Sequence, residues 1–332
     1  MLYSYFRTKT SNLYLLKDLS IMANQKWTAH GLRKLYRLDK KIKSMQTIYN
    51  AEERGDIPKA QRTLRGRVSV REWQIEDLPI IGKHFGFINS LNNQKIFCIY
   101  TAKGGVLKTT LAYTLARIFA INGIRTLIVG LDIQCSITDI TLPPKDLKSL
   151  EDSQAEQYAG LYHFLYDQKD LIQVIQKTSL PTLDIIPETP DLNLLEKKLR
   201  LEPRREYLLL DKLIPHLSDY DVIIFDNGPS WNQLIESALT AANIVLSPIG
   251  CDIGTYQALQ TNLATLIDFQ QAMQLDWKHF FLIPTLLEKT KLSRQIYERY
   301  LSQYAEQIIP NPIRRGVKGQ EAFLLYQSII EH

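Results

Sequence analysis

The sequence contains little cysteine and no long hydrophobic run. Only three of its 332 residues are cysteines, at positions 98, 135 and 251, and no two of them have the Cys-x-x-Cys spacing. This excludes a disulfide framework and gives no signature of a zinc or iron–sulfur site. No apolar stretch approaches the ~20 residues of a membrane-spanning helix. With 45% hydrophobic and 23% charged residues, the chain has the composition of a globular protein, and we expect it in the cytoplasm.

The first 25 residues also lack the features of a targeting segment. They are basic and rich in tyrosine, and Lys17 and Asp18 interrupt the apolar core that a signal peptide requires. Met22 is a second candidate start. We therefore expect residues 1–25 to be disordered or to precede the true start of the protein.

From about residue 91 to residue 332, apolar runs alternate with helical patterns. The runs are rich in Ile, Val and Phe, as in strands covered on both faces, and they span residues 95–100, 126–132, 182–187, 221–227, 243–249, 280–285 and 307–312. Helical patterns cover residues 108–122, 157–177, 203–217, 231–241, 254–274, 290–304 and 317–330. This alternation predicts an α/β domain with a doubly wound, mostly parallel sheet flanked by helices.

Three polar motifs follow three of these strands: "TAKGGVLKTT", "GLDIQCSIT" and "DNGPSW". Ligands of such sheets bind at the carboxyl ends of the strands, so we expect the motifs to lie together. The glycine-rich turn can close its N–H groups around phosphates, with Lys108 reaching the terminal ones and Thr109 binding Mg²⁺. Asp226 can hold Mg²⁺ through water and Asp132 can orient an attacking water. A single strand-end aspartate would more often cap a helix; three ordered motifs indicate a P-loop nucleotide hydrolase.

The segments "KGGVLKTT", "GLDIQCSIT" and "DVIIFDNGPS" resemble the Walker A, A′ and B motifs of the ParA/MinD family of deviant-Walker ATPases. The later "LSPIGCDIGTYQAL", "FLIPTLLEKTKLSRQIYERY" and "IIPNPIRRGVKGQEA" fit the same family, so that the resemblance covers roughly residues 94–330. Lys103 matches the family's signature lysine. The resemblance implies that it crosses a nucleotide-sandwiched homodimer to the partner's ATP.

The resemblance also implies the cofactors ATP and Mg²⁺ and a set of site residues. Lys103, Lys108 and Asp132 would be catalytic, and Thr109 and Asp226 would bind the metal. The nucleotide would be bound by Gly104, Gly105, Val106, Leu107, Lys108, Thr109, Thr110, Pro284 and Thr285.

The sequence departs from the family pattern at three positions. Leu107 stands where the family has glycine, and because leucine disfavours positive φ we expect a different local backbone and weaker ATP binding or hydrolysis. Gly130 replaces the first aspartate of the usual Asp-x-Asp pattern, and Ile133 replaces its proline. Since the charged motif residues remain, we expect a slow ATPase.

The N-terminal quarter carries the positive charge. The net charge is +5, whereas residues 26–83 contain 14 Lys and Arg against 7 Asp and Glu. This surplus favours contact with a polyanion, although a solvated basic helix would show the same composition. Apolar spacing predicts a helix over residues 27–53, followed by a ribbon near Val68–Val70 and a short helix from Ile75. Residues 26–90 thus outline a small winged helix-turn-helix.

This region resembles the MerR-like DNA-binding module that precedes the ATPase in longer ParA proteins. The resemblance implies DNA contacts by Arg62, Arg65, Arg67 and Arg71. In the ATPase domain, basic residues that could contact DNA phosphates lie near one helix and the loop after it: Lys289, Lys291, Arg294, Arg299, Arg314, Arg315 and Lys318.

Among the branches of the family, the sequence fits DNA partition best. The C-terminal helix lacks the basic face of a membrane anchor, and the cysteines do not suit an iron–sulfur cluster. We expect an ATPase that dimerises on ATP, binds non-specific DNA on the nucleoid, and is released when a ParB-like centromere-binding protein stimulates hydrolysis. The alternatives are a nucleotide-switched transcriptional repressor and a positioning ATPase for a protein cargo.

Overall fold

The computed structural model describes residues 26–40, 44–88, 90–142 and 158–316, together with residues 322, 327, 328, 330 and 331. The predictions for residues 1–25, for Lys318 and for most of the 317–330 helix lie outside the described residues.

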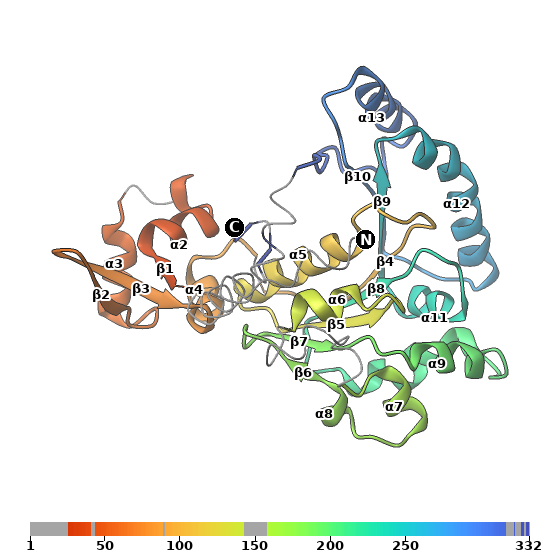
Figure 1. Ribbon diagram of the computed structural model, residues 1–332, viewed down its shortest axis with the longest axis horizontal. Coiled ribbons are helices and arrows are strands. Elements are labelled where there is room, and N and C mark those ends of the chain that lie inside the picture. Colours follow the sequence, from red (N-terminus) through yellow and green to blue (C-terminus); the bar gives the residue numbers. More distant parts are fainter. Residues whose placement is uncertain are drawn as a thin grey trace, which may run out of the picture.

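A seven-stranded sheet forms the centre of the molecule (Figure 1). Its strand order is β10-β9-β4-β8-β5-β7-β6, and every neighbouring pair is parallel except β7 and β6. This confirms the mostly parallel, doubly wound sheet expected from the apolar runs. The strands are β4 (Lys95–Ile99), β5 (Thr126–Leu131), β6 (Gln176–Lys177), β7 (Leu183–Ile186), β8 (Val222–Asn227), β9 (Ile244–Gly250) and β10 (His279–Thr285).

Helices cover both faces because successive strand residues point to opposite sides. In β8, Ile224 packs in the core under α5, whereas Ile223 and Phe225 pack in the core under α9, α10 and α11. A third core lies between α12, α13 and the strands β9 and β10. The helices of this body are α5 (Lys108–Ile121), α6 (Ser136–Thr141), α7 (Leu161–Tyr166), α8 (Leu171–Val174), α9 (Leu192–Leu199), α10 (Leu208–Lys212), α11 (Gln233–Ala241), α12 (Ile253–Ala272) and α13 (Lys291–Gln303).

Three predicted elements of this body are wrong. The 157–177 helix is two short helices and β6, with a left-handed residue, Gln168, between the helices (φ 55°). The 203–217 helix is α10 between two 3₁₀ turns, since Pro215 cannot continue an α-helix. The 307–312 strand makes only an isolated bridge, between Leu282 and Ile308.

The N-terminal region forms a smaller unit beside the body (Figure 1). The predicted 27–53 helix is wrong: Arg37 is left-handed (φ 54°), and the segment divides into a strand and separate helices. The predicted ribbon is a hairpin that turns at Gly66 (φ 65°) and joins a three-stranded antiparallel sheet. The elements are β1 (Lys26–Thr28), α2 (Ala29–Leu35), η1 (Leu38–Lys40), α3 (Gln46–Arg54), β2 (Gln61–Arg65), β3 (Val68–Gln74), η2 (Ile75–Asp77) and α4 (Leu78–Phe85).

Close contacts join this unit to the end of α5. The Tyr36 hydroxyl lies 2.6 Å from the Leu78 carbonyl oxygen and 3.0 Å from that of Ile121, and shares its proton between them. Gly82 packs so tightly that a Cβ added there would lie 1.8 Å from the Ile121 oxygen. One hydrophobic core therefore continues from the N-terminal region into the body.

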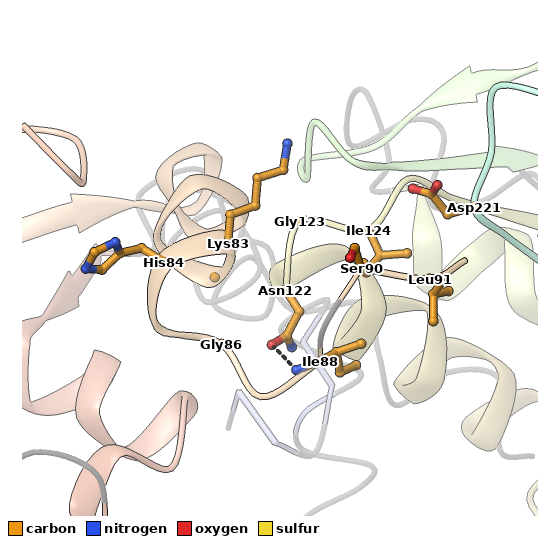
Figure 2. Close-up of a pocket in the computed structure, with 11 residues that line it drawn as sticks. Lys83, His84, Gly86, Ile88, Ser90, Leu91, Asn122, Gly123, Ile124 and Asp221 are labelled. Carbon is orange, nitrogen blue, oxygen red and sulfur yellow. Dashed lines mark hydrogen bonds between the residues drawn. The ribbon is translucent and has the colours of Figure 1, made fainter. Parts of the chain in front are cut away.

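A cleft of about 660 Å³ lies beside this contact, lined in part by Lys83, His84, Asn122 and Asp221 (Figure 2). The Asn122 side chain accepts hydrogen bonds from the Phe87 and Ile88 N–H groups at 2.9 and 3.4 Å. It thereby fixes the segment that leads from α4 toward β4.

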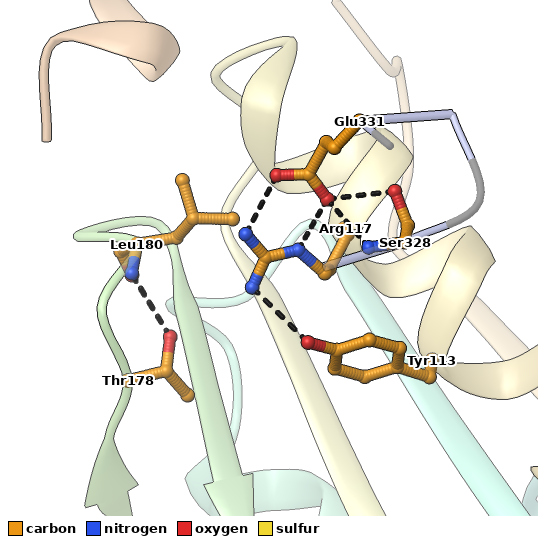
Figure 3. A network of polar contacts seen from close by, with 6 residues as sticks. All are labelled: Tyr113, Arg117, Thr178, Leu180, Ser328 and Glu331. Carbon is orange, nitrogen blue, oxygen red and sulfur yellow. Dashed lines mark hydrogen bonds and ion pairs between the residues drawn. The ribbon is translucent and has the colours of Figure 1, made fainter. Parts of the chain in front are cut away.

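A buried ion pair fastens the C-terminal residues to α5 (Figure 3). Arg117 donates from its Nη2 to Glu331 Oε1 at 2.6 Å, and Glu331 also accepts from the Ser328 N–H at 2.9 Å. Arg117 also donates to the Tyr113 hydroxyl at 3.3 Å. Burial opposes ionisation, but Arg117 and Ser328 outweigh it and hold the pKa of Glu331 below its usual range.

Candidate nucleotide site

The glycine-rich loop connects β4 to α5. Lys108 is the first residue of the 14-residue α5, so the free N–H groups of this helix point into the loop. Gly105 takes φ 73°, which glycine adopts without strain. The loop lines a pocket of about 480 Å³ together with Asp132 and Pro229.

Leu107 precedes α5 in the left-handed conformation, with φ 69° and ψ 33°. A non-glycine residue incurs roughly 1–2 kcal/mol there. The loop therefore has the backbone that a glycine would favour. The expected change of the local backbone at Leu107 is wrong, because the substitution is accommodated as strain. The Leu107 side chain lines the pocket, where it adds apolar surface.

Lys108 is buried and its Nζ donates to the Lys103 carbonyl at 2.8 Å. Burial lowers the pKa of Lys108, while Asp226 and Asp132 act in the opposite direction. A bound phosphate would stabilise the protonated amine, as the predicted role of Lys108 requires.

Asp226 lies at the same edge of the sheet. It pairs in register with Ile99 on one side and Gly130 on the other, and is fully buried. Burial raises its pKa to about 7; Thr109 and Lys108 oppose the rise and Asp132 adds to it. Although Thr109 is close, neither carboxylate oxygen has a hydrogen-bond partner of ordinary geometry among the described residues.

These unpartnered oxygens fit a hard cation. Mg²⁺ is bound by few protein oxygens and by phosphates and water, so a buried carboxylate beside a hydroxyl suits it. Thr109 and Asp226 thus remain the predicted metal ligands, and the structure brings them together.

Asp132 follows β5 and faces the same pocket. Its Oδ1 accepts from the Gln134 N–H at 3.1 Å, and a Cβ on Gly228 would lie 3.2 Å from the same oxygen. The A′ and B motifs therefore touch, and Asp132 is placed beside Lys108 and Asp226 as predicted.

Lys103 is exposed and reaches toward the start of α12. Its Nζ would lie 3.6 Å from a Cβ added to Gly254. Burial raises the pKa of Asp252, but hydrogen bonds from Thr255 and the charge of Lys103 bring it below its usual range. In the single chain, Lys103 thus lies by an acidic helix start and its amine is accessible.

Pro284 and Thr285 end β10 and are buried behind the loop. The Thr285 hydroxyl donates to the Val106 carbonyl at 3.2 Å. Thr285 therefore supports the loop from behind, a contact that the nucleotide-binding prediction does not include. Thr110 and the glycines line the pocket, as expected of nucleotide-contacting residues.

Glu188 is a further acid at this site and was not among the predicted site residues. It follows β7, and its carboxylate is fully buried beside the A′ segment. Burial, reinforced by Asp226 and Asp132, raises the pKa of Glu188 well above its usual range. The segment "LDIIPE" also ends an apolar strand with an acid, but the contact of Glu188 with Asp132 depends on β7 pairing beside β5.

Of the N-terminal arginines predicted to contact DNA, two are engaged within the chain. Arg65 pairs with Glu72 at 2.7 Å, and Arg71 pairs with Glu52 at 2.7 Å and lies over the Tyr49 ring. Arg62 and Arg67 are exposed on the hairpin.

The basic residues near α13 form a second, separate group. Lys289, Lys291 and Arg294 border a shallow pocket of about 360 Å³. Arg314 is exposed, whereas Arg315 donates to Glu288 at 2.6 Å. Figure 1 shows the N-terminal hairpin and α13 well apart, so the structure does not bring the two predicted DNA-binding groups together.

Comparison with known proteins decides the family. Residues 94–279 match the AAA domain family. The chain is 30% identical to "Chromosome partitioning protein ParA" of Myxococcus xanthus, over 68% of this chain and 77% of that protein. It is 31% identical to "Sporulation initiation inhibitor protein Soj" of Bacillus subtilis, over 69% and 87%. The chain belongs to the ParA/Soj family of P-loop ATPases.

Solved structures show a similar fold. A "Partition Protein" is similar over 97% of this chain and 96% of its own, with a TM-score of 0.66 and 17% identity, which shows the fold. Cobyrinic acid a,c-diamide synthase from Mycobacterium smegmatis, solved with an ATP analog and magnesium, is 28% identical. It covers 70% of this chain and 91% of its own, with a TM-score of 0.57. Within the part of the chain that the structure describes, no helix has the length and apolar character needed to span a membrane.

Proposed function

We propose that this protein is a slow, Mg²⁺-dependent ATPase that partitions DNA. The observation that carries the ATPase assignment is Asp226, whose buried oxygens are unpartnered beside Thr109 and Lys108 at the loop. The ATP analog and magnesium in the related M. smegmatis structure support the same ligands here.

Each residue of the site has its own role in the proposed reaction. The glycine loop and the start of α5 bind the phosphates, and Lys108 balances their charge. Mg²⁺, when bound by Thr109 and Asp226, would neutralise charge on the phosphate oxygens. Asp132, which lines the same pocket, orients the attacking water. Leu107 makes the loop strained, which fits a slow enzyme.

Lys103 is proposed to act between two copies of the chain. Its exposed amine is free to reach a nucleotide bound to a partner, so ATP binding would favour a homodimer. The dimer would double the basic surface near α13, including Arg294 and Arg314. It would thereby bind nucleoid DNA without sequence preference, until a ParB-like protein stimulates hydrolysis.

Calorimetry with ATP, ADP and Mg²⁺, followed by turnover measurements, tests the enzymatic part. We expect binding that requires Lys108 and hydrolysis that requires Mg²⁺. If ATP does not bind with Mg²⁺ present, the nucleotide assignment is wrong, and Leu107→Gly is the variant in which binding should then be measured.

One observation favours the repressor alternative. The hairpin presents Arg62 and Arg67 beside exposed Leu64 and Val68, so it could contact one particular DNA site. Binding that needs a single sequence and ignores nucleotide would favour that function. If no DNA binds in any nucleotide state, a protein cargo becomes the better explanation.

A further inference from the structure

Glu188 makes a concentrated set of contacts beside the site. Its Oε1 accepts from the Asp132 N–H at 3.2 Å, and its Oε2 accepts from the N–H groups of Ile137 and Thr138 at 3.1 and 3.4 Å. The Thr138 hydroxyl in turn accepts from the Glu188 N–H at 2.8 Å. One carboxylate thus joins both ends of the turn that carries Asp132.

Ile137 and Thr138 belong to the first turn of α6, whose N–H groups have no partner within the helix. Cys135, the residue before α6, is itself left-handed (φ 56°) and makes no side-chain cap. Glu188 therefore satisfies donors that the turn cannot satisfy by itself. Without it, buried N–H groups would be left unpaired.

Gly130 provides the space for this carboxylate. A Cβ added to Gly130 would lie 2.3 Å from Glu188 Cγ and 2.9 Å from both Glu188 Cδ and Ile137 Cγ2, so Glu188 makes the closest of these contacts. Gly130 does not have positive φ, so space and not backbone conformation requires glycine there. Position 130 is the one at which the family pattern has an aspartate.

We propose that Glu188 is the positioning residue for Asp132. Its carboxylate comes from the end of β7 and occupies the space of the aspartate side chain that the family pattern has at position 130. The side chain at position 130 and the side chain at position 188 occupy the same volume, so only one can be large. Glu188 fixes the backbone from Asp132 to Thr138 and so aims the Asp132 carboxylate into the pocket. This role rests on the proposed ATP hydrolysis, whereas the steric pairing does not.

Thermal unfolding without nucleotide tests the steric pairing. Gly130→Ala, Glu188→Ala and the double variant are compared with the wild type. Gly130→Ala should lower the unfolding midpoint by at least roughly 5 °C, and Glu188→Ala in the same chain should recover part of this loss. If Gly130→Ala does not yield folded protein, the double variant should. If Gly130→Ala lowers the unfolding midpoint equally with Glu and with Ala at position 188, the steric pairing is overturned.

Glu188→Gln tests the positioning. Glutamine keeps the side-chain volume, but its single oxygen cannot accept both from the Asp132 N–H and from the N–H groups of Ile137 and Thr138. We expect at least a tenfold fall in kcat with the Kd for ATP changed by less than threefold. Replacing both residues, by Gly130→Asp with Glu188→Ala, should restore part of kcat relative to Glu188→Ala. Glu202→Gln, which removes a half-buried carboxylate bonded to Tyr166, is the matched control and should leave kcat unchanged.

Hydrogen exchange separates this inference from the function on which it rests. In Glu188→Gln, amides of Asp132, Ile137 and Thr138 should exchange faster than in the wild type, whether or not ATP is hydrolysed. If the wild type does not hydrolyse ATP but Glu188→Gln still exchanges these amides faster, the ATPase proposal is refuted and the positioning of the turn by Glu188 stands. Unchanged exchange together with an unchanged kcat would overturn the proposal.

Discussion

We expect Leu107 to restrain turnover at the glycine-rich loop. It has a backbone conformation that favours glycine, and its side chain lines the pocket. Leu107→Gly should therefore bind ATP more tightly and turn over faster, by roughly threefold to tenfold, the equivalent of about 1 kcal/mol. Calorimetry and steady-state kinetics measure both effects.

The matched control is Leu201→Gly, which changes an exposed leucine (88% exposed) in another part of the chain. Leu201→Gly should alter neither the affinity for ATP nor the turnover rate. Slower turnover in Leu107→Gly would show that the leucine contributes to catalysis and does not restrain it.

We expect Lys108 and Asp132 to have separable roles at the same pocket. Lys108→Ala removes the charge that faces the phosphates, so ATP binding should be lost. Asp132→Ala leaves the loop intact but removes the water-orienting carboxylate, so the ATP-bound dimer should accumulate. Light scattering in the presence of ATP distinguishes a monomer from a dimer. Identical profiles for the two variants would contradict this division.

At the scale of elements, the end of α5 carries the contact with the N-terminal region. Gly82→Ala places a methyl group against the Ile121 carbonyl, 1.8 Å from its oxygen before relaxation. We expect a loss of roughly 3 kcal/mol or more in unfolding free energy, measured by urea denaturation. Ile80→Ala changes an exposed residue of the same helix and should have little effect. Equal stability of the two variants would mean that α4 can move away freely.

The Arg117–Glu331 pair fastens the C-terminal residues to the same helix. Glu331→Gln leaves a buried, uncompensated guanidinium, so stability at pH 7 should fall by roughly 3–5 kcal/mol. Because the folded-state pKa of Glu331 is lowered, the ion pair contributes fully above the unfolded-state pKa of about 4.3 and its contribution is lost as the pH falls. The difference from the wild type should therefore shrink on acidification.

Urea denaturation midpoints of the wild type and of Glu331→Gln, taken between pH 7 and pH 3, measure this difference in stability. Glu288→Gln removes an exposed ion pair with Arg315 and should cost less than about 1 kcal/mol. A difference between wild type and Glu331→Gln that grows toward low pH would contradict the assignment.

The elements that sequence predicted well are those whose pattern depends on burial alone. Apolar runs such as 221–227 must be strands once both faces are covered, and the strand-end motifs then meet at one edge. The 27–53 helix failed because its apolar spacing continues across Arg37, where the chain reverses in a left-handed conformation. Glu188 was missed because its contact with Asp132 depends on β7 pairing beside β5, which no local pattern specifies.

For the whole molecule, we propose that ATP controls DNA binding. Each phosphate neutralised on duplex DNA contributes a slope of about −0.9 to the dependence of log K on log salt. A dimer presents twice the basic residues of one chain, so ATP should increase both the affinity and the steepness of this dependence. We expect the basic group near α13, where Arg294 and Arg314 are exposed, to form this DNA-binding surface.

The most direct measurement is a salt titration of binding to random-sequence duplex DNA with ATP, with ADP and without nucleotide. The wild type should bind most tightly and with the steepest slope in ATP. Arg294→Glu with Arg314→Glu should flatten that slope while ATP binding is unchanged, and Arg204→Glu, beside Asp211, should behave like the wild type. Binding with the same affinity and slope in all three nucleotide conditions, or no DNA binding in any of them, would contradict the partition account.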